Sequence, residues 1–89
     1  MIVEYHEAAF KHKVSESDIE WALSTHVYEK PAADGSFLVV GFNRVGNPLE
    51  VAFRELDDGT LFVFHAMPCR QKWLDEANLG QKPLRSKNG

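Results

Sequence analysis

The sequence contains very little cysteine and no long apolar segment. Cys69 is the only cysteine among 89 residues, which excludes an internal disulfide. The longest uncharged apolar run, FLVVGF at residues 37–42, is far shorter than the roughly 20 residues of a membrane helix. The first residues, MIVEYHEAAF, lack the cationic start and apolar core of a secretory signal peptide. We therefore expect a cytoplasmic protein with no segment in a membrane.

Cofactor and metal motifs are also absent from the sequence. The four histidines, His6, His12, His26 and His65, do not have a metal-ligand spacing such as HxxxH, and a single cysteine cannot complete a structural zinc site. The chain has no glycine-rich phosphate loop, no Ser-His-Asp arrangement and no internal repeat. We therefore expect neither a metal nor an organic cofactor.

Positive charge is scarce outside the carboxyl-terminal end. The net charge is −3, and residues 81–89 carry three cations and no acid, so residues 1–80 have a balance of −6. Phosphate contacts supply most of the non-specific affinity for nucleic acids, so any basic surface here must be local. The composition, with 44 % hydrophobic and 26 % charged residues, is that of a folded protein. We expect one domain over residues 1–80 and a disordered basic tail over residues 81–89.

Two helices are predicted in the amino-terminal third. The first covers residues 3–12, although its beginning is equally compatible with an extended segment. The second runs from Glu16 to about Thr25, because Ser15 suits the N-cap and Asp18 stands three residues later. Its buried stripe has the spacing i, i+3, i+4 and i+7 and comprises Ile19, Ala22, Leu23 and His26.

Trp21 lies opposite that buried stripe, about 200° around the helix from Ile19. Such an aromatic side chain is either covered by another element, for which a last helix carrying Trp73 is a candidate, or presented to a partner protein. Tryptophan is enriched at the centres of protein interfaces, which favours the partner.

Alternation and β-favouring residues predict three strands, at residues 36–42, 49–56 and 61–66, with residues 27–30 as a fourth strand at the edge. Short turns join them, so consecutive hairpins form an antiparallel meander. We predict an α+β fold: two N-terminal helices, a three- to four-stranded antiparallel β-meander and a C-terminal helix, with the helices on one face of the sheet.

The turn after residue 56 decides which side chains share a face. If residues 58–59 form a two-residue loop, Arg54 pairs with Val63, Ala52 pairs with His65, and Arg54 and His65 are diagonal neighbours. The core face is then built by Val51, Phe53, Phe62 and Phe64. A three-residue loop with a bulge would shift the register by one and separate Arg54 from His65.

The last helix is predicted to open at Pro68, to bury Trp73, Leu74 and Ala77, and to stop at Gly80. Its charges oppose the helix dipole, because cations come first and acids last.

The cations in the first turn of that helix are Arg70 and Lys72. This order predicts a bound anion, for which a phosphate is the natural candidate. The alternatives are that both cations pair with acids of a neighbouring element, or that the segment is not helical.

His65 directly precedes this cationic segment. Its ordinary pKa, about 6.5, suits general acid–base catalysis, and cations at Arg54, Arg70 and Lys72 would favour its neutral form. A neutral imidazole among cations could act as the base in phosphodiester cleavage. The alternative is a half-buried histidine bonded to the backbone.

Lys11, His12 and Lys13 form a second basic spot, which is either an RNA contact or a solvated loop. Cys69 could have a lowered pKa near a helix start, but it is more simply a small filler residue.

Two motifs resemble a known family. FKHKVSESDIEWAL resembles the KHGVS opening of small bacterial toxins of the BrnT type and of a related actinobacterial group, and LDDGTLFVFHAMPCRQKWL resembles that group's HAMPxRxK ending. The likeness covers about residues 10–74. It implies a RelE-like fold with helices packed on an antiparallel sheet, ribonuclease activity, and neutralisation by a cognate antitoxin.

The resemblance assigns His12 to the family's opening histidine, and His65, Arg70 and Lys72 to its terminal cluster. Two positions differ: Lys13 replaces the glycine that follows the histidine, and Gln71 replaces a common proline.

Two hypotheses of function result. The first is a toxin-like endoribonuclease of a toxin–antitoxin pair, which cleaves RNA by metal-independent acid–base chemistry through His65, with Arg70 and Lys72 on the phosphate and Arg54 in support. The second is a non-catalytic protein-binding module of the same fold, which holds a partner through Trp21 and the sheet face away from the core.

Overall fold

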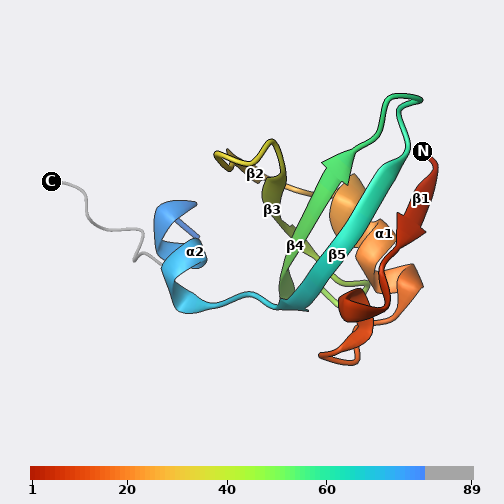
Figure 1. Ribbon diagram of the computed structural model, residues 1–89. Helices are drawn as coiled ribbons and strands as arrows, with labels where there is room; N and C mark the ends of the chain where they lie inside the picture. The colour runs from red at the N-terminus through yellow and green to blue at the C-terminus, as the bar shows by residue number, and fades with distance from the viewer. Residues whose placement is uncertain (80–89) are drawn as a thin grey trace, which may run out of the picture.

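The computed structural model describes residues 1–79 (Figure 1). Its elements, in chain order, are β1 Val3–Tyr5, the 3₁₀ turn η1 Glu7–Phe10, α1 Glu16–Ser24, β2 Tyr28–Pro31, β3 Phe37–Phe42, β4 Pro48–Glu55, β5 Leu61–Pro68 and α2 Gln71–Glu76. The strands form one sheet in the order β1-β5-β4-β3-β2. Strands β2 to β5 are the predicted antiparallel meander, including the edge strand. The predicted basic tail lies outside the described residues. The last helix does not stop at Gly80 as predicted, because α2 ends at Glu76 and Asn78, with φ of 64°, takes the left-handed conformation after its C-cap.

The amino-terminal segment is not the predicted helix, and its beginning takes the extended alternative. Val3–Tyr5 is a strand that pairs parallel with β5, which makes the sheet five-stranded and mixed rather than a pure meander. His6 then begins the short turn η1, where its Nδ1 accepts a hydrogen bond from the Ala8 backbone N–H. Pairing with the open edge of β5 outweighs the weak helical periodicity of this segment, so only one α-helix precedes the meander.

Helix α1 has the predicted beginning and most of the predicted buried face. His26 was predicted on that face, but it follows the helix end at Ser24 and is exposed. The Ser15 hydroxyl accepts from the Asp18 backbone N–H at 3.1 Å, as an N-cap does. Ile19, Ala22 and Leu23 are buried against the sheet. The contact is close at Gly41 of β3, where an added Cβ would stand 2.0 Å from the Ala22 carbonyl oxygen. Only glycine therefore allows this helix to lie directly on β3.

The hairpin between β4 and β5 combines both predicted registers. Residues 57–59 form a three-residue loop, so Arg54 pairs with Phe62 and not with Val63. A bulge then takes up one residue of β5 at Phe64, and Ala52 pairs with His65 beyond it. The three-residue loop with a bulge therefore does not move His65 to the other face, because the two one-residue shifts cancel.

The sheet has two different faces. The face under α1 holds the apolar core, with the strand residues Val39, Leu49, Val51, Phe53, Val63 and Ala66. Phe62 and Phe64 are not part of this core, contrary to the prediction, because the longer loop turns them to the second face. Helix α2 also lies on the second face, where Trp73 adjoins Ala52 and Phe64. The helices are therefore not gathered on one face.

Two backbone details concern the predicted motifs. Lys13 has a positive φ of 63°, the left-handed conformation that glycine adopts without cost, which explains why a glycine suits this position. Helix α2 begins at Gln71 with Arg70 as N-cap, and Pro68 ends β5 instead of opening the helix. None of the helices within residues 1–79 is long and apolar enough to cross a membrane.

Candidate functional site

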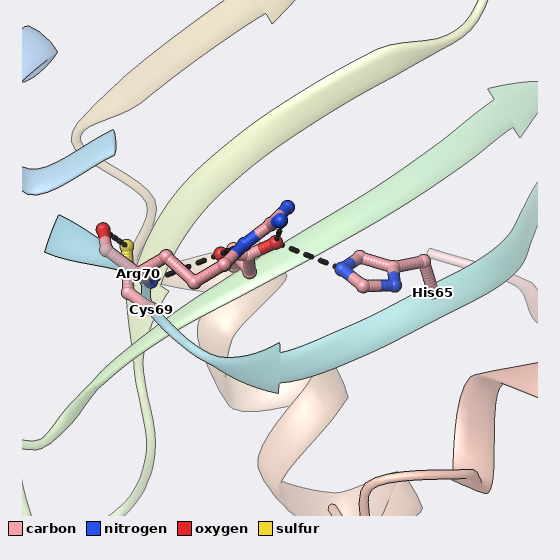
Figure 2. A network of polar contacts seen from close by, with 4 residues as sticks. His65, Cys69 and Arg70 are labelled. Carbon is pink, nitrogen blue, oxygen red and sulfur yellow. Dashed lines mark hydrogen bonds and ion pairs between the residues drawn. The ribbon is translucent and has the colours of Figure 1, made fainter. Parts of the chain in front are cut away.

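A buried carboxylate joins the two best candidate residues on the second face. Glu50 of β4 is 0 % exposed and faces away from α1, next to Ala52 on the same side of the strand. Its Oε1 accepts from the backbone N–H and the Nε of Arg70, both at 3.0 Å. Its Oε2 accepts from Arg70 Nη2 and His65 Nε2, both at 2.8 Å. Figure 2 shows His65 and Arg70 turned toward this shared carboxylate, with α1 behind the sheet.

The charge of Glu50 is stabilised where it is buried. Burial acts to raise the pKa of Glu50, but hydrogen bonds from Arg70 and His65 outweigh it and bring the pKa below its ordinary value. The same contacts raise the pKa of Arg70, first through the hydrogen bond and then through the negative charge. Removal of either partner would leave a buried charge without compensation, so the three side chains form one unit.

The contact with Glu50 determines which nitrogen of His65 carries hydrogen. An ionised carboxylate accepts hydrogen bonds and cannot donate them, so Nε2 must be the protonated nitrogen. In the neutral ring Nδ1 is then free to accept a proton. The side chain is 28 % exposed, so it is accessible from solvent while Glu50 is not. Cations were predicted around His65, but the charged group nearest to its ring is the Glu50 carboxylate.

The anion predicted at the start of α2 is part of the chain itself. The backbone N–H and guanidinium of Arg70 both bind Glu50, which is the alternative in which a cation pairs with an acid of a neighbouring element. The guanidinium side chain is still 48 % exposed. Lys72 makes no ion pair within residues 1–79, and its Nζ lies 4.6 Å from the centre of the Trp73 ring.

Arg54 shares the second face with His65 but does not join the Glu50 network. Its Nη1 donates to the Asp34 backbone carbonyl at 2.9 Å, and its guanidinium carbon lies 6.0 Å from the centre of the Phe64 ring. The bulged residue Phe64 stands between Arg54 and His65 along the strands.

His12 is brought to the site although it is 53 positions from His65 in the sequence. The two rings are 5.9 Å apart between centres and nearly perpendicular. Lys11 and Lys13 flank His12 and are exposed. The turn η1 packs on β5, which carries the basic spot to the end of that strand.

Cys69 is not a nucleophile at neutral pH. Burial, and then the nearby charge of Glu50, raise the pKa of the thiol to about 11, so it stays protonated. Its predicted role as a filler residue agrees with this environment.

Trp21 is not covered by α2, which lies on the other side of the sheet. It is 41 % exposed, and the guanidinium of Arg44 lies 4.6 Å from the centre of its ring. Cover by the last helix is therefore wrong for Trp21, and a contact with a partner protein stays a prediction. Within residues 1–79, no three His, Cys, Asp or Glu side chains are arranged to hold a metal ion.

Glu50, the centre of the site, was not among the residues predicted from the sequence. It stands in the strand segment PLEVAFRE and has the period-two position of an exposed residue. One feature of the sequence could have indicated Glu50. His65 pairs across the strands with Ala52, and Glu50 lies two residues before Ala52 on the same side of β4, within reach of His65.

Comparisons with known proteins identify the fold. No protein-family model and no curated protein matches the chain. Among solved structures, the crystal structure of the Brucella abortus ribonuclease toxin BrnT matches with a TM-score of 0.60. The match covers 80 % of this chain and 100 % of that one, at 18 % sequence identity. This chain has a BrnT-like fold. The resemblance suggested by the two motifs is therefore confirmed at the level of the fold.

Proposed function

We propose that the protein is a toxin-like endoribonuclease of a toxin–antitoxin pair, which cleaves RNA by acid–base chemistry without a metal ion. The observation that carries the proposal is the unit of Glu50, His65 and Arg70, placed beside His12 on a fold shared with a ribonuclease toxin. The unit supplies a proton acceptor and a phosphate-binding cation at one point of the surface.

In the proposed reaction His65 is the general base. Its Nδ1 takes the proton of a ribose 2′-OH, the 2′-oxygen attacks the adjacent phosphorus, and the bond between phosphorus and the 5′-oxygen breaks. His65 becomes an imidazolium whose charge is stabilised by Glu50 through Nε2. Protonated His12 gives its proton to the leaving 5′-oxygen, so the products are a 2′,3′-cyclic phosphate and a 5′-hydroxyl.

Negative charge develops on the phosphoryl oxygens during cleavage and must be stabilised by cations. These cations must keep part of their positive charge available despite the nearby Glu50 carboxylate. Arg70 uses Nε and Nη2 for Glu50, which leaves Nη1 and the exposed side of the guanidinium for a phosphate. Lys72, two residues further, adds a second positive charge, and Arg54 supports binding from further along the same face. Lys11 and Lys13 attract the RNA backbone at the His12 end.

The proposed cleavage mechanism is tested by identifying the chemical groups at the ends of the RNA fragments. The purified chain is incubated with single-stranded RNA in a chelating buffer, and the fragments are analysed for 2′,3′-cyclic phosphate ends. Arg70→Ala is expected to lower the cleavage rate strongly. Fragments with 3′-hydroxyl ends, or cleavage that stops when metal ions are chelated, would contradict the mechanism.

The proposed partner is a cognate antitoxin protein. Expression of the chain alone is expected to arrest bacterial growth, and His65→Ala is expected to relieve the arrest. Harmless overexpression of the folded wild type would count against a toxin.

The second candidate function is a protein-binding module without catalysis, and the exposure of Trp21 on the face opposite the site favours it. This function predicts a stable complex that Trp21→Ala weakens, together with no RNA cleavage. Exposed Val45, in the loop after β3, provides a control: Val45→Ala should leave the affinity unchanged.

A further inference from the structure

An apolar groove adjoins the Glu50 site on the second face of the sheet. It lies between α2 and strands β2 to β5 and has a volume of about 240 Å³. Its apolar lining includes Leu38, Ala52, Phe64 and Trp73. Ala52 is the direct cross-strand partner of His65, and Trp73 follows Arg70 by three residues. The groove and the Glu50 site are therefore adjacent.

Cations gather around the aromatic walls of the groove. Lys30 Nζ and Lys72 Nζ lie 5.5 and 4.6 Å from the centre of the Trp73 ring, and Arg54 stands over Phe64. With Arg70, four of the seven cations in residues 1–80 lie on this side of an otherwise acidic chain. Three of them have acid partners, namely Asp34, Glu50 and Glu76, while Lys72 has none within residues 1–79.

The Trp73 indole has a buried donor without an acceptor. Among the described residues, its Nε1 is the one buried side-chain nitrogen or oxygen that lacks a hydrogen-bond partner. Buried donors in proteins are nearly always paired, so an acceptor from a bound molecule would complete this wall. An apolar side chain of a protein partner would neither accept a hydrogen bond from Nε1 nor balance the charge of the cations.

Aromatic walls with surrounding cations are the combination by which proteins hold bases of single-stranded nucleic acids. The geometry points to this groove as the binding site for one unstacked base of single-stranded RNA, next to the phosphodiester that is cleaved at His65 and Arg70. The base stacks on Trp73 or Phe64, and it offers an acceptor atom to Nε1 once the indole turns to open its buried edge. This inference rests on the proposed ribonuclease function, because that function supplies the RNA.

Binding can be measured without cleavage. The full chain is titrated with a short single-stranded RNA in which every 2′-OH is methylated, and with versions that lack one base at each position in turn. One abasic position is expected to weaken binding to the wild type by roughly 5- to 150-fold, the range for loss of one stacked base. An equal affinity for all abasic versions would overturn the inference.

Variants locate the effect in the groove. Trp73→Ala and Phe64→Ala should weaken binding to the intact RNA, and Trp73→Ala should remove the penalty of the abasic position. Trp73→Phe keeps a ring without the N–H and should lose less. Phe10→Ala is the matched control, because Phe10 is an exposed ring that packs on Tyr5 away from the groove. Unchanged RNA affinity in folded Trp73→Ala, with loss of a co-expressed protein partner, would assign the groove to that protein instead.

These experiments distinguish failure of the base-binding site from failure of the ribonuclease function. Cleavage of unmodified RNA together with a flat abasic series would reject the base site and leave the ribonuclease standing. A clear abasic penalty without any cleavage would keep the base site and reject the ribonuclease.

Discussion

The two faces of the sheet are built in opposite ways. Under α1 the strand side chains are apolar and closely packed, and the helix approaches β3 as far as a glycine allows. On the second face the fully buried Glu50 accepts hydrogen bonds from Arg70 and His65. Helix α2 contacts the sheet largely through polar groups, such as the hydrogen bond from the Tyr28 hydroxyl to Glu76. The first face therefore provides stability, while the second holds charged groups in place at a cost in desolvation.

The first face should be the more sensitive to added volume. Gly41→Ala would force a methyl group against the Ala22 carbonyl, so α1 must move, and we expect a loss of about 3 kcal/mol or more in the free energy of unfolding. Urea denaturation measures this. The control is Gly46→Ala, where φ is +92° but the space is open, and about 1 kcal/mol should be lost. Equal losses in both variants would mean that the helix does not lie directly on β3.

The second face should be the more sensitive to loss of charge. Glu50→Gln keeps the volume but weakens the bonds to His65 and Arg70, and we expect a loss of about 2 kcal/mol at pH 7, less than for a fully enclosed pair because Arg70 is half exposed. Arg70→Ala should cost a similar amount, and the double variant should cost clearly less than the sum of the two. Additive losses would show that the two side chains do not act as a unit.

The same carboxylate should make stability depend on pH. The pKa of Glu50 is lower in the folded protein than its value of about 4.3 in an unfolded chain. Its contribution is therefore fully present above about pH 4.3 and is lost as the pH falls through the lower folded value. The pKa values of Asp34, Asp58 and Glu76 are also lowered, so the difference between wild type and Glu50→Gln isolates this contribution. That difference should shrink on acidification, and a constant difference would argue against an ionised Glu50.

The smallest expected effect lies in the turn that carries His12. Lys13→Gly should raise the free energy of unfolding by about 1 kcal/mol, because Lys13 has a left-handed backbone. Thermal unfolding measures the gain. Lys11→Gly, at a position with φ of −58°, is the control and should lower stability. A destabilised Lys13→Gly would mean that the Lys13 side chain is needed for packing.

Features with local causes could be predicted from the sequence. The cap at Ser15 and the stripe beginning at Ile19 determine α1 within one segment, and alternation with short turns determines β3, β4 and β5. The parallel strand β1 could not be predicted, because three residues give too little periodicity and its partner lies nearly sixty positions away.

The candidate site was predictable only in part, for the same reason. His65, Arg70 and Lys72 stand together in one motif and were found. Glu50 binds partners 15 and 20 positions away, and its position among them depends on the bulge at Phe64. The sequence could not show that this bulge returns His65 to the face of Glu50, because residues 61–64 and Ala66 are all apolar and do not mark where the alternation breaks.

The most direct test of the account compares the rate of RNA cleavage by wild type, His65→Gln and His26→Gln in a chelating buffer. His26 is the matched control, since its ring bonds to the Leu23 carbonyl and lies outside the site. We expect folded His65→Gln to lose at least roughly 100-fold in rate, as for loss of a general base, while His26→Gln keeps the rate of the wild type. Cleavage by His65→Gln at the wild-type rate would contradict this expectation.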